Sequence, residues 1–345
     1  MSASAILLMN LGSPDSPTAK ALRPYLSEFL MDERVIDLPL FARTLLVKGM
    51  IVPFRAGKSA AKYRTIWTEK GSPLVIHTQQ LRDLLQDRFD VPVYYSMRYG
   101  NPATATVLDS IHIDNPDLQE LIVLPLYPHY AMSSYETAAE QVKSEHKKAG
   151  FRFALKIVPP FYNHSLYIRA LAQSIKPYID RPFDHLLFSY HGIPERHIYK
   201  SDCSGTHCLK TADCCGMESV AHAHCYRHQI ITTTELVAGE LGLDKSRYSF
   251  SFQSRLGRDA WLKPYTASQL SDFPNRGIKK LLVVCPAFVS DCLETLEEID
   301  REGREDFLHA GGEYYEMIPA LNEEPAWLDC AEELIRMQFT TVPCV

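Results

Sequence analysis

The sequence lacks three features that would place it in other classes of protein. It holds no apolar run that is long enough to span a bilayer, for which about 20 residues are needed. Its formal net charge of -6 excludes a nucleic-acid partner held by bulk positive charge. The apolar start, Met1–Leu11, has neither a basic region nor a small-residue cleavage site, and this favours a first strand over a signal peptide. We therefore expect a cytoplasmic protein that touches the inner membrane at most peripherally.

Cysteine is present but unevenly spread. Of nine cysteines, five fall between Cys203 and Cys225. Disulfides are rare in a reducing compartment, so a dense cluster of thiols there indicates a bound metal.

Short apolar runs alternate with helix-period segments along the chain. Continuous runs such as Leu121–Leu124 and Leu281–Val284 are typical of strands covered on both faces, as in parallel α/β sheets. The segments between them, among them Ser133–Ala149 and Cys292–Leu308, favour βαβ units. The predicted strands are Ala5–Asn10, Val91–Met97, Glu120–Leu126, Phe153–Val158, His185–Tyr190, Tyr248–Phe252, Lys280–Cys285 and Glu313–Met317.

Four predicted strands fall in each half of the chain, which predicts two similar α/β domains. A short internal sequence similarity supports this division. Leu121–Pro125 leads to Glu136–Glu140, and Leu282–Pro286 leads to Glu294–Glu298. We place the domains at residues 1–165 and 166–345. Because ligands of open α/β sheets bind beyond the carboxyl ends of the strands, we expect the functional residues there.

The stretch from Leu38 to Phe54 is apolar but is interrupted by Arg43 and Lys48. This pattern fits an amphipathic lip, at about residues 38–56, or a surface that touches a membrane. A helix buried against the core is the alternative.

The first candidate strand end is Phe188–Pro194. A histidine, His191, ends the strand, and Gly192 and Pro194 then turn the chain. An imidazole at such a cleft can act as a base or metal ligand near neutral pH. A structural histidine is the alternative.

The second candidate strand end leads into an acidic helix, which Ser290 or Asp291 would cap. Glu294, Glu298 and Glu302 follow at a spacing of four, so a regular helix would align them along one stripe. Such a file of carboxylates can conduct protons or deliver a cation. A solvated acidic face is the alternative.

With these segments the sequence resembles the ferrochelatase family along nearly its whole length. The joint order and spacing of the matching segments are specific. They are Leu8–Pro14, Tyr63–Arg64, Gly71–Pro73, Ser96–Gly100, Leu126–Tyr130, Ser189–Pro194, Phe252–Gly257, Trp261–Leu262 and Phe288–Asp300. The resemblance implies Fe²⁺ insertion into a porphyrin in haem biosynthesis. It also implies two Rossmann-like domains, each with a mainly parallel sheet flanked by helices, and a porphyrin cleft between them.

The resemblance also implies roles for single residues. His191 and Glu294 would form the catalytic pair and bind the incoming Fe²⁺. The path for protons or metal would follow Glu298, Glu302 and Asp291. The implied porphyrin-binding residues are Leu11, Arg98, Tyr99, Tyr130, Trp261 and Phe288. Cys292 occupies a slot where other members carry histidine, so no catalytic role is assigned to it.

A cysteine-rich insertion, at about residues 199–226, buries little apolar surface and would need a stabilising cross-link or bound metal. Its thiols can hold an iron–sulfur cluster or a zinc ion. Some ferrochelatases carry a 2Fe-2S cluster, often through C-terminal cysteines, but here the C-terminus offers only Cys344. The resemblance therefore implies a 2Fe-2S cluster on four of the five internal cysteines, with structural Zn²⁺ or free thiols as alternatives. These five are Cys203, Cys208, Cys214, Cys215 and Cys225.

The prediction of which porphyrin is the substrate depends on Leu11. With a leucine at this turn the sequence resembles enzymes that take protoporphyrin IX, whereas enzymes that take coproporphyrin III often have a tyrosine there. Coproporphyrin III remains one alternative. A related cobalt chelatase and a non-enzymatic haem or porphyrin binder are the others.

Overall fold

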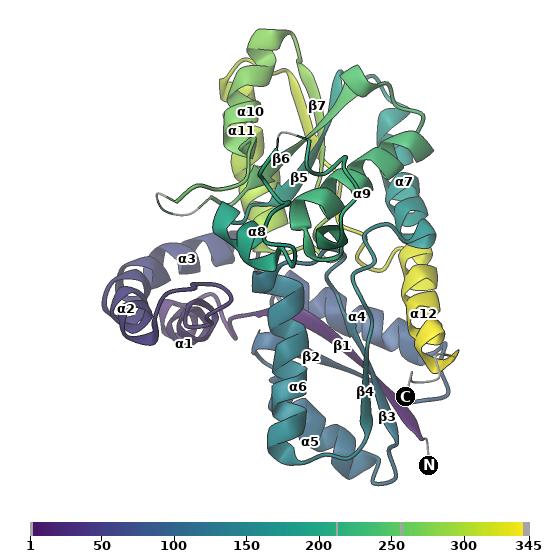
Figure 1. Cartoon of the computed structure of the whole chain (residues 1–345). Coiled ribbons are helices and arrows are strands. Elements are labelled where there is room, and N and C mark those ends of the chain that lie inside the picture. Colours follow the sequence, from purple (N-terminus) through teal and green to yellow (C-terminus); the bar gives the residue numbers. More distant parts are fainter. Residues whose placement is uncertain (1–2, 212, 256, 258, 341–345) are drawn as a thin grey trace. The chain divides into compact units, whose positions relative to one another are not determined.

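The computed structural model describes residues 3–211, 213–255, 257 and 259–340. Its strands form two four-stranded sheets, in the orders β2-β1-β3-β4 and β6-β5-β7-β8 (Figure 1). Every strand pair in both sheets is parallel. The predicted α/β class and both parallel sheets are therefore confirmed.

The chain divides into two compact units, one around each sheet. The first comprises Met1–Leu126, Met132–Pro159 and Leu328–Val345, and the second comprises Tyr127–Ala131 and Pro160–Trp327. This division differs from the predicted ranges 1–165 and 166–345 at its ends. The last helix belongs to the first unit because Arg88 pairs with Asp329 at 2.6 Å and with Glu332 at 2.8 Å.

The first unit surrounds a sheet whose central strand is almost entirely buried. Helices α4, α5 and α6 pack against this sheet (Figure 1). Its strands are β1 (Ser4–Ser13), β2 (Val93–Gly100), β3 (Glu120–Pro125) and β4 (Ala154–Ile157). Its helices are α1 (Ala19–Leu30), α2 (Leu40–Thr44), η1 (Leu45–Ile51), α3 (Val52–Ile66), α4 (Pro73–Gln86), α5 (Thr104–Asp114), η2 (Met132–Glu136), α6 (Thr137–Ala149) and α12 (Pro325–Thr340).

The second unit repeats this arrangement around β5. Its strands are β5 (His185–His191), β6 (Tyr248–Gln253), β7 (Lys280–Val284) and β8 (Tyr314–Met317). Its helices are α7 (Ser165–Ile179), α8 (Glu195–Ser201), η3 (Val220–His224), α9 (Tyr226–Glu240), η4 (Lys245–Arg247), α10 (Thr266–Asp272), η5 (Phe273–Arg276), η6 (Glu294–Glu302) and α11 (Gly303–His309). Each predicted strand is present in the described residues, with ends shifted by at most three positions.

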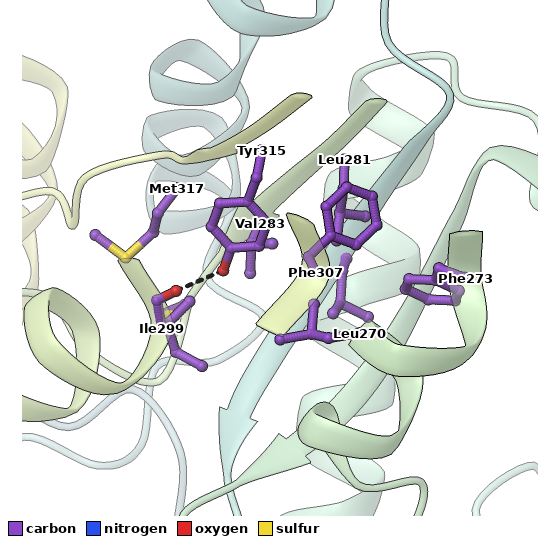
Figure 2. Close-up of a cluster of buried hydrophobic side chains, with 10 residues drawn as sticks. Leu270, Phe273, Leu281, Val283, Ile299, Phe307, Tyr315 and Met317 are labelled. Atoms are coloured by element: carbon purple, nitrogen blue, oxygen red, sulfur yellow. Dashed lines mark hydrogen bonds between the residues drawn. The ribbon is translucent and has the colours of Figure 1, made fainter. Parts of the chain in front are cut away.

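A core beneath η6 and α11 holds these helices on the second sheet (Figure 2). Ile299 of η6 and Phe307 of α11 are both at most 1% exposed. The hydroxyl of Tyr315, on β8, donates to the carbonyl oxygen of Ile299 at 2.6 Å, as the dashed line in Figure 2 marks. The position of the acidic helix is thus fixed from below by burial and by one directional bond.

The predicted acidic helix is present, but it is not a regular α-helix. Residues Glu294–Glu302 form a π-helix, with hydrogen bonds such as that from the N–H of Gly303 to the carbonyl of Glu298, five residues earlier. A spacing of four residues keeps Glu294, Glu298 and Glu302 on successive turns of this wider helix. π-Helical geometry is rare and occurs frequently at functional sites.

The predicted lip is formed by α2, η1 and the start of α3. Phe41 is 83% exposed and Phe54 is 78% exposed, whereas Val47 on the same segment is fully buried. The segment is therefore amphipathic, with one apolar face packed and another in solvent. Among the described residues, no helix combines the length and apolar character required to cross a membrane.

Candidate active site

His191 is the last residue of β5 and lies at the carboxyl edge of the second sheet. Its Nδ1 lies 2.7 Å from the carbonyl oxygen of Gly192. Because a carbonyl only accepts, Nδ1 carries the hydrogen and Nε2 carries the lone pair. The hydroxyl of Tyr226 donates to the main-chain carbonyl of His191 at 2.9 Å. The imidazole is thus held in the tautomer whose Nε2 can accept a proton or bind a metal ion.

Gly192 lets the chain pass closely between two neighbours. A β-carbon at this position would lie 2.7 Å from the carbonyl oxygen of Gln253 and 3.2 Å from the ring of Trp261. The N–H of Gly192 donates to that same carbonyl at 2.8 Å. A larger residue would push the strand end that carries His191 away from β6.

Gln253, the last residue of β6, links the two predicted catalytic residues. It pairs with His191 in the sheet, and its side-chain amide nitrogen, Nε2, donates to the main-chain carbonyl oxygen of Glu294 at 2.9 Å. Its Oε1 accepts from the hydroxyl of Ser189 at 2.7 Å. The side chain is 3% exposed. Although Gln253 lies in a segment that carries the family resemblance, its type and position give no sign of this bridge.

The carboxylate of Glu298 is held by Ser254, which follows β6 directly. The N–H of Ser254 donates to Oε1 at 2.7 Å, and its hydroxyl donates to Oε2 at 2.5 Å. Burial raises the pKa of Glu298, and the charge of Glu294 adds to this, although Ser254 and His191 oppose it. This carboxyl is therefore easier to protonate than an exposed one.

Glu294, the first residue of η6, is half-buried. The thiol of Cys292 hydrogen-bonds to the carboxylate of Glu294. Burial, and to a lesser extent the charge of Glu294, raises the pKa of Cys292 well above 9.0. Cys292 therefore stays a neutral donor beside Glu294. Glu302, the last residue of the π-helix, is also half-buried.

Asp291 is engaged by other groups of the second unit. Its carboxylate accepts from the hydroxyl of Thr295 at 2.8 Å, from the side-chain amide of Asn322 at 2.8 Å and from the N–H of Ala320 at 3.3 Å. It is 5% exposed. Its predicted place on the proton or metal path stays a prediction, and the contacts that surround it are those of a structural carboxylate.

Three of the predicted porphyrin-binding residues belong to the second unit. The ring of Phe288 meets that of His191 edge to face, with the centroids 6.3 Å apart. Trp261 is 9% exposed and borders Gly192. Tyr130 is half-buried in this unit, and its ring meets that of His224 edge to face, with the centroids 4.7 Å apart. The structure thus brings Phe288 and Trp261 to the strand end of His191, and the porphyrin-binding role of Tyr130 stays a prediction.

The other three belong to the first unit. Leu11 is half-buried on β1, and Arg98 and Tyr99 lie on β2. Arg98 forms an ion pair with the carboxylate of Asp32, to which the hydroxyl of Tyr99 donates at 2.9 Å. Tyr99 is fully buried, so its hydroxyl serves this network.

Asp32 is charged within that network despite its burial. Burial favours the neutral form, but hydrogen bonds from Thr137 and the N–H of Arg34, together with the charge of Arg98, hold the pKa of Asp32 below its usual range. Arg98 is consequently a neutralised, fixed side chain.

Four of the five clustered cysteines lie close together. Cys208, Cys214 and Cys225 are buried and Cys215 is half-buried, whereas Cys203 is exposed. The sulfurs of Cys214 and Cys215 are 4.0 Å apart. Burial raises the pKa of Cys208 to about 11, although a hydrogen bond with Cys225 acts to lower it. A hydrogen bond with Cys225, followed by burial, raises the pKa of Cys215.

Cationic and polar groups surround this thiol pair. The guanidinium of Arg227 lies 3.3 Å from the sulfur of Cys215 and 3.8 Å from that of Cys214. Nε2 of His207 lies 2.6 Å, and Nε2 of His222 lies 3.2 Å, from the carbonyl oxygen of Cys214. Within the described part of the chain, no group of three or more His, Cys, Asp or Glu side chains is arranged to hold a metal ion. Cys344 lies outside the described residues.

Comparison with known proteins agrees with the fold and with the resemblance. The Ferrochelatase family model matches residues 3–339. A ferrochelatase of Opitutus terrae is 47% identical over 335 residues, which cover 96% of both chains. One of Azotobacter vinelandii is 45% identical over 334 residues, 96% of this chain and 98% of that protein.

Among solved structures, SirB from Bacillus subtilis with Fe³⁺ is similar with a TM-score of 0.54. It shares 12% sequence identity, and the match covers 98% of this chain and 96% of that one. This likeness concerns the fold. The match of the family model over nearly the whole chain, and the identity to relatives of the same length, show that the chain belongs to the ferrochelatase family, the enzymes that insert iron into a porphyrin in haem synthesis.

Proposed function

We propose that the protein inserts Fe²⁺ into protoporphyrin IX, forming protohaem and releasing two protons, with His191 and Glu294 as the catalytic pair. The observation that carries this proposal is the bridge by Gln253. Its side chain holds the carbonyl of Glu294 at 2.9 Å, while its main chain pairs with His191. The main chain of both residues is thereby tied to Gln253 at one edge of the second sheet.

The chemistry calls for such a pair. A free-base porphyrin holds two weakly acidic inner N–H protons, and both must leave as the metal enters. A flat ring also does not present its nitrogen lone pairs to a metal. The site must therefore distort the ring, accept protons and supply a partly desolvated ferrous ion. Apolar walls such as Phe288 and Trp261 suit the grip on the ring, because remote binding energy can offset distortion.

The two residues share the roles of proton acceptor and iron ligand. Nε2 of His191 has the lone pair for either role, and imidazole and carboxylate both suit Fe²⁺. Glu298 is the next acceptor, because burial raises its pKa and thereby makes its carboxylate a stronger base. Glu302 would carry the path onward along the helix.

The choice of protoporphyrin IX rests on the apolar side chain of Leu11. An anaerobic assay with equal concentrations of protoporphyrin IX and coproporphyrin III, each with Fe²⁺ and with Co²⁺, tests it. We expect many turnovers with protoporphyrin and Fe²⁺. Faster turnover with coproporphyrin would reassign the substrate, and faster turnover with Co²⁺ would reassign the metal. A single stoichiometric spectral change would indicate a binder.

We propose a 2Fe-2S cluster as a further group of this protein, held by Cys208, Cys214, Cys215 and Cys225. The proposal is supported by the proximity of these thiols and by Arg227, whose positive charge suits sulfur ligands that carry negative charge. A bound cluster would supply one-electron redox chemistry and order the segment. Exposed Cys203 is the fifth candidate. Purified protein from iron-replete, anaerobic expression should absorb visible light and bleach with dithionite, whereas stoichiometric zinc would favour a structural zinc site.

The exposed face of the lip supports peripheral membrane contact. Leu40, Phe41 and Phe54 are 65%, 83% and 78% exposed, and Lys48 and Arg55 lie exposed on the same segment. Apolar anchors flanked by cations bind anionic bilayers at their interface. Flotation with anionic vesicles should recover the wild type but not a Phe41→Ser/Phe54→Ser variant; equal recovery would contradict this contact.

A further inference from the structure

We propose that Asn322 is a positioning residue for iron insertion, which acts through Asp291 to hold the start of the π-helix that carries Glu294. Asn322 lies in the loop between β8 and α12, far in sequence from the catalytic residues. The inference rests on the proposed function and adds a residue to its site.

Asn322 clasps the loop that precedes η6 through three hydrogen bonds. Its Nδ2 donates to Oδ2 of Asp291 at 2.8 Å, and its Oδ1 accepts from the N–H of Asp291 at 2.8 Å. Its own N–H donates to the carbonyl of Val289 at 2.8 Å. The backbone of Asn322 has a φ of 46°, a conformation that asparagine tolerates better than most residues. Both ends of one amide thus grip one residue.

Asp291 passes this constraint to the helix. Its Oδ1 accepts from the hydroxyl of Thr295 at 2.8 Å, and the N–H of Cys292 donates to the same hydroxyl at 3.0 Å. Thr295 and Asp291 are 1% and 5% exposed. Glu294 lies between these anchored residues, so its carboxylate is displaced whenever the clasp opens.

The clasp gives Asp291 a role that does not involve its proton. Three donors fix the carboxylate: Asn322, Thr295 and the N–H of Ala320. What the geometry needs at this position is an acceptor toward Thr295 and a complementary partner toward Asn322. A neutral amide can meet both needs if its partner becomes the carboxylate.

The reciprocal exchange of the two side chains tests this inference. Asn322→Asp sets two carboxylates against each other, and Asp291→Asn sets two amides with mismatched donors. The double variant restores one carboxylate and one amide in opposite places. We expect each single variant to lower kcat for iron insertion about 10- to 100-fold, since misplacement by an ångström can cost this much. Porphyrin affinity, measured by fluorescence quenching, should stay within about twofold.

The double variant should recover kcat to within about threefold of the wild type, because complementary pairs are restored as units and not additively. A folded double variant that stays as slow as Asp291→Asn would overturn the inference, because the charge at position 291 would itself be required. Wild-type kcat in Asn322→Asp would overturn it as well.

A matched control separates positioning from general stability. Asn115 of the first unit is also buried, and its amide donates to the carbonyl of Ile111 at 2.9 Å and to the hydroxyl of Tyr94 at 3.0 Å. Asn115→Ala should lower the melting temperature without lowering kcat. If a single exchange variant does not fold, Asn322→Gly removes the amide and retains the backbone conformation, and it should show the same loss of kcat.

The wild type separates the two proposals. Absence of turnover in the wild type with protoporphyrin and Fe²⁺ would contradict the proposed function. Turnover in the wild type without recovery in the double variant would contradict the clasp alone.

Discussion

The two units share one topology but differ in how the glutamates of their π-helices are partnered. In each unit a π-helix follows the third strand, η2 after β3 and η6 after β7. Glu136, which ends η2, is bound by the guanidinium of Arg34 at 3.0 Å. Glu294, which begins η6, instead receives a neutral thiol from Cys292. A repeated fold thus carries a neutralised carboxylate in one unit and a chemically available one in the other, because function depends on the site and not on the fold.

The central strands differ in the same way. Near the end of β1, the Nδ2 of Asn10 donates to Thr78 at 2.9 Å and its Oδ1 accepts from the N–H of Leu11 at 2.8 Å. At the end of β5, His191 uses Nδ1 for the chain and keeps the lone pair on Nε2. The first strand end is structurally satisfied, and the second can exchange a proton.

Removal of the imidazole should have the largest effect. His191→Ala should lower iron insertion by about 10²- to 10⁴-fold, as expected when a general base is lost, and leave porphyrin affinity nearly unchanged because the ring is held by apolar walls. Anaerobic kinetics and fluorescence titration measure the two quantities.

His185, which begins the same strand, is the matched control. Its Nε2 lies 2.8 Å from the hydroxyl of Ser249, and burial lowers its pKa to about 4. His185→Ala should reduce stability but not kcat. Wild-type turnover in a folded His191→Ala protein would refute the assignment of the catalytic base.

Paired glutamate substitutions test the difference between the two π-helices. Glu294→Gln should lose nearly as much activity as His191→Ala, because it removes the charge and the base while it retains the shape. Glu136→Gln should stay within about threefold of the wild type, since a partly exposed ion pair contributes little. Equal losses in both variants, measured as kcat, would contradict the comparison.

Cysteine variants should have a smaller effect on activity and a clear effect on colour. Cys208→Ser and Cys225→Ser should lower both visible absorbance and insertion rate, because a bound metal group often orders its segment. Cys203→Ser should do the same if Cys203 is a ligand. Buried Cys285, which lies 3.7 Å from Oε1 of Gln253, is the control, and Cys285→Ser should keep the colour. A colourless, iron-free and fully active protein would exclude a required cluster.

Glu298→Gln should be milder than Glu294→Gln, because Glu298 is the second acceptor, after the catalytic pair of His191 and Glu294. We expect a loss of about tenfold, at the low end of general acid–base effects. If initial rates show Glu298→Gln to be the more severe variant, the order of the carboxylates is wrong.

The pH dependence of stability should have opposite signs in the two units. The pKa of Glu298 is raised above 4.5, so its contribution is present at low pH and is lost as pH rises through the folded pKa. The pKa of Asp32 is lowered below 3.8, so its contribution is present above that value and is lost as pH falls through the folded pKa. Urea unfolding of Glu298→Gln, Asp32→Asn and wild type across pH about 3 to 8 should show differences of opposite slope. Parallel slopes would contradict these assignments.

Much of the fold could be predicted from the sequence, because strands that are buried on both faces of a parallel sheet consist of continuous apolar runs. The runs Leu121–Leu124 and Leu281–Val284 became β3 and β7. That α12 belongs to the first unit could not be predicted, because its place depends on long-range contacts such as the ion pair of Arg88 with Asp329. Hydrophobic periodicity does not separate α- from π-helix, since both bury one face, so the helix over Cys292–Leu308 could be predicted but the π geometry of η6 could not.

The candidate site was predictable only where residue type suggests chemistry. His191 and Glu294 stand out because imidazole and carboxylate titrate and bind metals. Gln253 and Asn322 do not titrate, and their roles arise from contacts that a linear sequence does not contain. Asp291 shows the converse limit, because an acidic residue in an acidic segment is structurally engaged on both oxygens.

The most direct test of the central claim is the number of protons released during a single anaerobic turnover. Wild-type protein saturated with protoporphyrin IX is mixed with Fe²⁺ in a weakly buffered indicator solution, and absorbance follows protohaem and protons together. The account predicts two protons per protohaem in the wild type, and bound porphyrin with neither product in Glu294→Gln. Protohaem formation and proton release at wild-type rates in Glu294→Gln would contradict it.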